Sequence, residues 1–140
     1  MAKKKIKKVS TKKLKGKLWK LFSLWVRLRE ADKLGYSSCI SCGKSYHFKS
    51  MNAGHFIHGT WTKLTGLDER NVWSQCVFCN VGADGNHVGY LEGLRKKIGQ
   101  DEIDALLEIR HQIWKPSTQE IEDLIKTYEV KLNFIKELQV

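Results

Sequence analysis

Cys39-Ile-Ser-Cys42 and its counterpart Cys76-Val-Phe-Cys79 contain all four cysteines of this 140-residue chain. Two C-x-x-C pairs supply the four thiolates that a structural, tetrahedral zinc ion takes, and each pair is short enough to bind one edge of the ion. The 33 residues between Cys42 and Cys76 exceed the 15–20 of a simple zinc ribbon. We therefore predict one structural Zn²⁺ bound by four cysteines, with a separately folded segment between the pairs.

Two other uses of the cysteines agree less well with the sequence. Disulfides belong to secreted proteins, but the basic N-terminus is followed by no apolar stretch before Leu18, as a signal peptide requires. A C-x-x-C pair can also be a redox motif, but two pairs without a thioredoxin-like βαβ pattern favour metal. No apolar run approaches the 18 or so residues of a membrane span, so we expect a cytoplasmic protein.

The positive charge is concentrated at the N-terminus. The net charge is +10, and residues 1–29 contain twelve Lys or Arg and no acid. Such an arm suits DNA, whose phosphates it would bind through counterion release without reading the sequence. A solubilising tail is the alternative, and a membrane-surface anchor is disfavoured because few apolar residues lie among the lysines. The expected DNA-binding residues are Lys3, Lys4, Lys5, Lys7, Lys8, Lys12, Lys13, Lys15 and Lys17.

The remaining pattern predicts an α+β protein. We expect a flexible arm over residues 1–16 and a single domain over 17–140, with its core at about 36–98. Apolar periodicity predicts helices over 17–34, 86–98 and 102–114, the third capped by Asp101. A last helix should begin at the capping box Ser117-Thr-Gln-Glu120.

Three short strands are expected in the centre of the chain. Residues 46–48 and 51–57 suit a β-hairpin, and residues 71–75 a strand that enters the second cysteine pair. The last helix carries a near-heptad apolar stripe, which packs either on the domain or on a second copy of the chain. The stripe consists of Ile121, Leu124, Tyr128, Leu132, Ile135 and Leu138.

A histidine and an asparagine lie where metal-dependent phosphodiester hydrolysis would need them. His55 is on a predicted strand between the cysteine pairs, and Asn80 directly follows Cys79. An imidazole can deprotonate water at neutral pH, and an Asn carbonyl oxygen can bind a hard cation such as Mg²⁺. A structural histidine and a helix cap are the simpler alternatives for these two residues. The order strand with His, strand, metal-bound turn and Asn is that of the ββα-metal, or HNH, nucleases.

Six segments of the chain match the pattern of one protein family: Phe22–Asp32, Cys39–Lys44, Asn52–Phe56, Asn71–Cys76, Cys79-Asn80 and Gly85-Asn86. They resemble the phage NinG/Rap recombination proteins, which are structure-directed endonucleases. The resemblance covers roughly residues 14–135. It implies a zinc-stapled, HNH-like core with flanking N- and C-terminal helices that cuts branched DNA, such as Holliday junctions and D-loops, with Mg²⁺ or Mn²⁺.

The cysteine frame and Asn80 are also similar to the phage endonuclease VII resolvases, which share the ββα-metal site and cut as dimers. This similarity implies a homodimer, for which the C-terminal helices are the candidate interface. If the chain is phage-encoded, it would act in the cytoplasm of the host cell.

The resemblance implies a role for each site residue. His55 would be the general base, Asn80 a ligand of the catalytic cation, and Asn71 the central Asn that ties the ββα loop together. Many ββα-metal nucleases have an Asp cation ligand directly before the histidine, where this chain has Gly54. The NinG-like Ala-Gly-His shares this departure. The second cation ligand must then come from elsewhere, and the candidates are Asn52, His58, Asp68, Asp84 and Asn86.

Two other classes of function fit parts of the sequence. A non-catalytic zinc-ribbon protein that binds nucleic acid would keep the zinc frame and the basic arm. A zinc-stapled adaptor for other proteins would use the last helix, but it leaves the lysine-rich arm unexplained. Cleavage of branched DNA distinguishes both classes from the nuclease.

Overall fold

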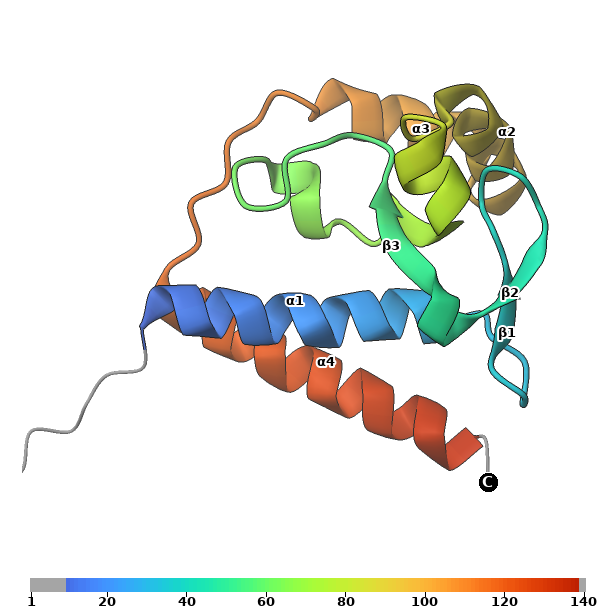
Figure 1. Cartoon of the computed structure of the whole chain (residues 1–140). Coiled ribbons are helices and arrows are strands. Elements are labelled where there is room, and N and C mark those ends of the chain that lie inside the picture. The colour runs from blue at the N-terminus through green and yellow to red at the C-terminus, as the bar shows by residue number, and fades with distance from the viewer. Residues whose placement is uncertain (1–9, 139–140) are drawn as a thin grey trace, which may run out of the picture.

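The computed structural model describes residues 10–138, which combine helices with two small antiparallel sheets (Figure 1). This confirms the α+β class with flanking helices. None of the helices in this range is long and apolar enough to cross a membrane. The elements, in chain order, are α1 (Thr11–Leu28), β1 (Tyr36–Ser38), β2 (Ser45–His47), β3 (Met51–His55), β4 (Val72–Cys76), α2 (His87–Lys97), α3 (Gly99–Glu108) and α4 (Thr118–Leu138).

Helices α1 and α4 lie side by side and form one layer of the molecule (Figure 1). They share a core with β3 and β4, because apolar residues recur every three or four positions on the facing sides of both helices. The last helix therefore uses its apolar stripe within the chain, although Ile125 replaces Leu124 among its fully buried residues. The buried members are Leu14, Leu18, Phe22 and Val26 of α1, Ile121, Ile125 and Tyr128 of α4, and Ala53 and Val72 of the strands.

Helix α1 begins and ends six residues earlier than the sequence pattern predicted. It begins at Thr11 because the side chain of Ser10 caps it, accepting a hydrogen bond from the backbone of Lys13 (3.3 Å). Residues 11–16, which we had expected in the flexible arm, are therefore helical, and residues 1–9 lie outside the described part. The helix ends at Leu28 because a turn follows, in which Asp32 accepts hydrogen bonds from two backbone amides (both 2.9 Å).

The predicted hairpin of residues 46–48 with 51–57 is wrong. Strand β2 pairs with β1, and β3 pairs with β4, both antiparallel. The single turn Phe48–Ser50 separates β2 from β3. Strand β3 pairs with β4, which leads into the second cysteine pair, and Met51 lies opposite Cys76. His55 is consequently the last residue of β3, opposite Val72 at the start of β4.

Helices α2 and α3 cover the other face of β3 and β4. The hydroxyl of Tyr90 in α2 joins them, because it donates to the carbonyl of Gly54 (2.7 Å) and accepts from the amide of Trp73 (3.0 Å). Tyr90 is fully buried in a second core with Trp73, Leu94 and Ile103. The hydrogen bonds of the Tyr90 hydroxyl therefore hold β3, which carries His55, against α2.

Of the three predicted later helices, only α3 has clearly different bounds. Helix α2 lies within the predicted range 86–98, and Asn86 caps it by accepting from the amide of Gly89 (3.3 Å). Helix α3 begins at Gly99, directly after α2, and ends at Glu108, so Asp101 lies in its first turn and is not its cap. The predicted extension to residue 114 is wrong, since Ile113 leaves the helix and bridges to Lys63. Ser117 caps α4 as predicted, accepting from the amide of Glu120 (3.1 Å).

Candidate metal centre and catalytic site

The four cysteines form a cluster in which every pair of sulfur atoms lies within 4.8 Å. The Sγ atoms of Cys42 and Cys76 are 3.8 Å apart, and a tetrahedral ion with Zn–S bonds of about 2.3 Å would place its sulfur ligands about 3.8 Å apart. Cys39, Cys76 and Cys79 are buried, while Cys42 is exposed. The donor set and its spacing therefore fit a structural metal such as zinc.

Polar hydrogens surround the cysteine cluster, as the sulfur ligands of a metal require. The amide of Cys76 donates to Sγ of Cys39 (3.3 Å), and the amide of Cys79 donates to Sγ of Cys76 (3.4 Å). The side-chain amide of Asn86 donates to Sγ of Cys79 (3.4 Å). These donors would stabilise thiolate charge, and the last one links the cluster to the start of α2.

His55 is held in one orientation at the end of β3. Its Nε2 lies 2.8 Å from the carbonyl oxygen of Gly66, with the hydroxyl of Thr60 at 3.4 Å. A carbonyl only accepts, so Nε2 carries the hydrogen and Nδ1 keeps the lone pair of the neutral ring. Trp19 of α1 stacks on the imidazole, with ring centres 5.5 Å apart. Burial lowers the pKa of His55 below its ordinary value of 6.5, which keeps the ring neutral at pH 7.

Asn71 ties together the loop that holds His55. Its side chain is fully buried and accepts from the amide of Ile57 (2.7 Å). It also donates to the carbonyls of Ile57 and Thr65 (both 2.9 Å). Because Thr65 directly precedes Gly66, these bonds also position the carbonyl that orients His55.

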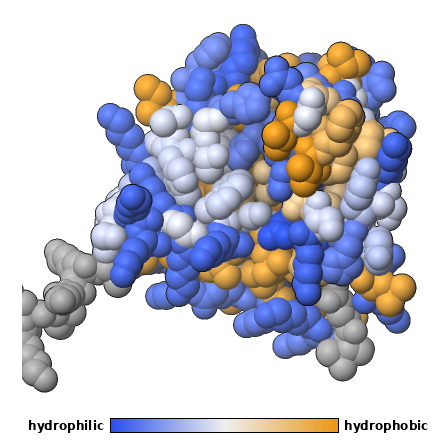
Figure 2. Space-filling view, viewed as in Figure 1, coloured by the Kyte–Doolittle hydropathy of each residue, from blue (hydrophilic) through white to orange (hydrophobic). Residues whose placement is uncertain are grey.

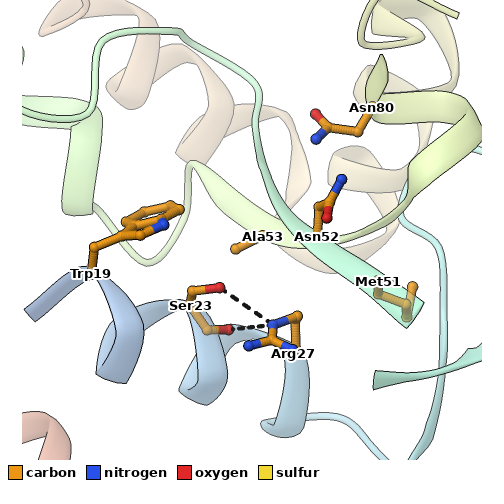
Figure 3. Close-up of a pocket in the computed structure, with 7 residues that line it drawn as sticks. All are labelled: Trp19, Ser23, Arg27, Met51, Asn52, Ala53 and Asn80. Carbon is orange, nitrogen blue, oxygen red and sulfur yellow. Dashed lines mark hydrogen bonds between the residues drawn. The ribbon is translucent and has the colours of Figure 1, made fainter. Parts of the chain in front are cut away.

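A shallow pocket of about 450 Å³ lies between α1 and β3, beside Trp19. Its walls are Trp19, Ser23 and Arg27 of α1, Met51, Asn52 and Ala53 of β3, and Asn80 of the wide helical turn Phe78–Gly82. In Figure 3 the side chains of Asn52 and Asn80 point toward one another, opposite Arg27. Since Trp19 also stacks on His55, this pocket adjoins the catalytic candidate.

Gly54 has a steric reason to lack a side chain. A Cβ atom at this position would overlap Oε1 of Gln75, which is fully buried. The amide of Gln75 cannot turn away easily, because its Nε2 donates to Ser41 (2.9 Å) and to the carbonyl of Gly85 (2.7 Å). An aspartate directly before His55 is therefore incompatible with Gln75 as it lies here.

The structure separates the candidates for a second cation ligand. Asn52 shares the pocket with Asn80. The side chain of Asn86 is engaged by Cys79 and by its cap on α2. Asp68 is paired with Arg70 (2.7 Å). His58 and Asp84 are exposed and are not among the residues that line this pocket.

The predicted DNA-binding lysines are only partly described. Lys12, Lys13, Lys15 and Lys17 belong to α1, where Lys17 pairs with Glu129 (3.6 Å) and Lys15 lies over Trp61 (5.6 Å to the ring centre). Lys3, Lys4, Lys5, Lys7 and Lys8 lie outside the described residues.

The sequence analysis did not identify the three pocket residues that α1 contributes, Trp19, Ser23 and Arg27. Ser23 and Arg27 lie on the polar face of a predicted helix, and such a face is expected to contact solvent. Trp19 belongs to no sequence motif that would indicate a role in a site. The available signal was that this helix contains no acidic residue over its whole length.

Comparison with known proteins identifies relatives over most of the chain. A family model described as "Bacteriophage Lambda NinG protein" matches residues 1–139. Protein ninG of Escherichia phage 933W is 31% identical over 112 residues, which are 80% of this chain and 53% of that protein. Protein ninG of Escherichia phage lambda is 30% identical over 112 residues (80% and 52%). That of Salmonella phage P22 is 31% identical over 113 residues (81% and 53%).

The chain spans about half the length of these curated relatives. No solved structure matches it. The family model and the curated relatives agree, and the chain belongs to the NinG family of bacteriophage proteins.

Proposed function

We propose that this chain is an HNH-type endonuclease that hydrolyses phosphodiester bonds of branched DNA. The observation that carries the proposal is the orientation of His55. Its Nε2 hydrogen is engaged by the Gly66 carbonyl, and burial lowers the pKa of the ring, so that a neutral imidazole presents Nδ1 as a base. The antiparallel pair of β3 and β4, followed by the second cysteine pair and α2, supports the proposal, because a ββα-metal site has two strands followed by a helix.

In the proposed reaction, Nδ1 of His55 takes a proton from a water molecule as its oxygen attacks phosphorus. A new P–O bond forms, the bond from phosphorus to the 3′ oxygen breaks, and the 3′ oxygen takes a proton from solvent. The carbonyl oxygens of Asn80 and Asn52 would hold a Mg²⁺ or Mn²⁺ ion, which stabilises negative charge on the phosphate and on the leaving oxygen. The four cysteines would hold Zn²⁺ in a structural role.

Asn52 is preferred to Asn86 and His58 as the second cation ligand. It lines the same pocket as Asn80, and neither its side chain nor that of Asn80 has a hydrogen-bond partner among residues 10–138. The Asn86 amide, by contrast, already has two partners. A cation bound by the carbonyl oxygens of Asn52 and Asn80 would give each of these side chains a binding partner.

Cleavage of a four-way junction, compared with a linear duplex of the same sequence, tests the proposal. The purified chain should cut the junction faster, and only with Mg²⁺ or Mn²⁺. Replacing His55 by Ala should lower the cleavage rate by about 10²–10⁴-fold, the usual contribution of a general base. The matched control is His111→Ala, which removes an exposed histidine after α3 and should leave the rate unchanged.

Three results would count against the nuclease. Full activity of His55→Ala would exclude this residue as the base. Equal cleavage of junction and duplex would exclude a preference for branches. Binding without cleavage of any DNA form by the wild-type chain would favour the second candidate, a non-catalytic zinc-ribbon protein that binds nucleic acid.

A homodimer through α4 is proposed as the form that cuts two strands. The buried face of α4 packs on α1, but Val130, Phe134 and Leu138 form a second stripe at four-residue spacing that is exposed. Sedimentation equilibrium should give twice the mass of the chain, and Phe134→Ser should shift it to the monomer. A wild-type monomer at micromolar concentration would contradict this interface.

A further inference from the structure

The exposed face of α1 carries a line of positive charge toward the pocket. Lys13, Lys20 and Arg27 recur at seven-residue intervals, which places them on one side of the helix about 10.5 Å apart. Between them lie the small residues Gly16 and Ser23. Helix α1 contains no acidic residue. Figure 2 shows hydrophilic side chains following α1 across the viewed face of the molecule.

Arg27, at the end of this line, is oriented by the protein but not neutralised by it. Its Nε donates to the carbonyl and hydroxyl oxygens of Ser23 (3.2 and 3.3 Å), and Nη1 donates to the carbonyl of Phe48 (3.1 Å). No carboxylate in residues 10–138 pairs with it. Arg70 differs, since Asp68 and Glu102 both bind its guanidinium (2.7 and 3.1 Å).

A half-buried cation held only by neutral acceptors suits an anionic ligand. Burial removes water from the guanidinium, and neutral acceptors offset this loss less than a negative charge does. Nη2 of Arg27 has no acceptor among the described residues and is available for such a charge. The fork of an arginine also matches the two free oxygens of a phosphodiester.

The pocket itself has the chemistry of a phosphate site. Besides Arg27 it offers the hydroxyl of Ser23 and the NH₂ groups of Asn52 and Asn80, whose carbonyl oxygens are left for the proposed cation, and no acidic side chain lines it. Figure 3 shows Arg27 on the α1 side and the two asparagines across from it. A phosphate between these walls would lie close to His55, which shares the Trp19 ring with the pocket.

We propose that Arg27 binds a backbone phosphate of the DNA in this pocket, and that the exposed face of α1 leads the sugar–phosphate backbone to it through Lys20 and Lys13. This inference rests on the proposed function, because it names the part of the nuclease site that holds the substrate phosphate. It gives α1 a role in the site and is independent of residues 1–9.

Equilibrium binding to a short fluorescent junction tests the proposal, with Mg²⁺ present and in the His55→Ala chain, so that no DNA is cut. Loss of a charge-assisted hydrogen bond at Arg27→Gln should raise Kd about tenfold or more. Arg27→Lys keeps the charge without the fork and should lose less affinity. The matched control is Arg110→Gln, which removes an exposed arginine after α3. It changes the net charge by the same amount and should change Kd by no more than about twofold.

Lys20→Gln makes the test independent of folding, because the Lys20 side chain is exposed and has no hydrogen bond or ion pair among residues 10–138. It should raise Kd and reduce the slope of log affinity against log salt by about 0.9, the value for one phosphate contact. Inorganic phosphate can occupy the pocket but cannot span α1, so it should compete far more weakly than an oligonucleotide.

The proposal is overturned if Arg27→Gln, with unchanged thermal melting, binds like Arg110→Gln, or if Lys20→Gln leaves the salt slope unchanged. Inorganic phosphate that competes as well as DNA would also overturn the α1 path. These measurements detect binding alone. A chain that never cleaves DNA but loses affinity at Arg27 would therefore refute the nuclease and keep the phosphate site.

Discussion

Asn71→Ala should destabilise the chain more than any other single loss of a polar side chain in the loop after β3. The substitution removes three hydrogen bonds, to the amide and carbonyl of Ile57 (2.7 and 2.9 Å) and to the carbonyl of Thr65 (2.9 Å). Each contributes roughly 1 kcal/mol, and backbone groups that remain buried without partners add to the loss. We expect the free energy of unfolding to fall by about 3 to 5 kcal/mol. For 140 residues this lowers Tm by roughly 10 to 17 °C.

The assay is urea denaturation with zinc present, followed by circular dichroism, with Asn133→Ala as control. Asn133 is an exposed residue of α4, so its replacement should change stability by less than about 0.5 kcal/mol. A loss below 1 kcal/mol for Asn71→Ala would refute the role of this side chain as the tie of the loop.

The same variant should also disturb His55. Thr65 precedes Gly66, whose carbonyl fixes the imidazole at 2.8 Å, so a loosened loop should expose the ring. Its pKa should then rise toward 6.5, because burial is what lowers it. The pKa of His55 in the folded variant can be measured by NMR titration. A pKa equal to that of the wild-type chain would show that Asn71 does not control the burial of the His55 ring.

Three further outcomes are expected. Cys76→Ala or a strong chelator should abolish cooperative thermal melting and release one zinc per chain, since the metal frame joins β4 to the first cysteine pair; normal melting without zinc would contradict this. The cleavage rate should rise with pH with a midpoint below 6.5, because burial lowers the pKa of the proposed base His55. A midpoint above 7 would exclude His55. Gly54→Ala should destabilise the chain measurably in urea, since its Cβ overlaps Gln75, and Gln75→Ala should relieve the defect in the double variant.

Features with a local signature could be predicted from the sequence. The two C-x-x-C pairs predicted a four-cysteine cluster, and the structure brings all four sulfurs together. The capping box at Ser117 predicted the start of α4, and the apolar periodicity of α4 predicted three of its buried residues, Ile121, Tyr128 and Leu132. These signals succeed because caps and helical periodicity depend on neighbours within four or five residues.

Strand pairing could not be predicted in the same way. Residues Tyr36–Ser38 have no alternating apolar pattern, yet they form β1, which pairs with β2 beside the first cysteine pair. Strand β3 pairs with a partner some twenty residues later in the chain. These strand pairings depend on which faces of the strands α1 and α2 cover, and on the cysteine cluster. The residues involved are far from one another in the sequence.

The site shows the same division between local and tertiary information. The sequence by itself determined the cysteine frame, the histidine between its halves and the acid-free character of α1. Only the tertiary structure decided that Gly66 orients His55, that Asn52 faces Asn80, and that Arg27 closes the pocket from another element. The physical reason is that a side chain's partners and burial depend on packing between elements. The charge and type of a residue can be read from the sequence, but the direction in which it points cannot.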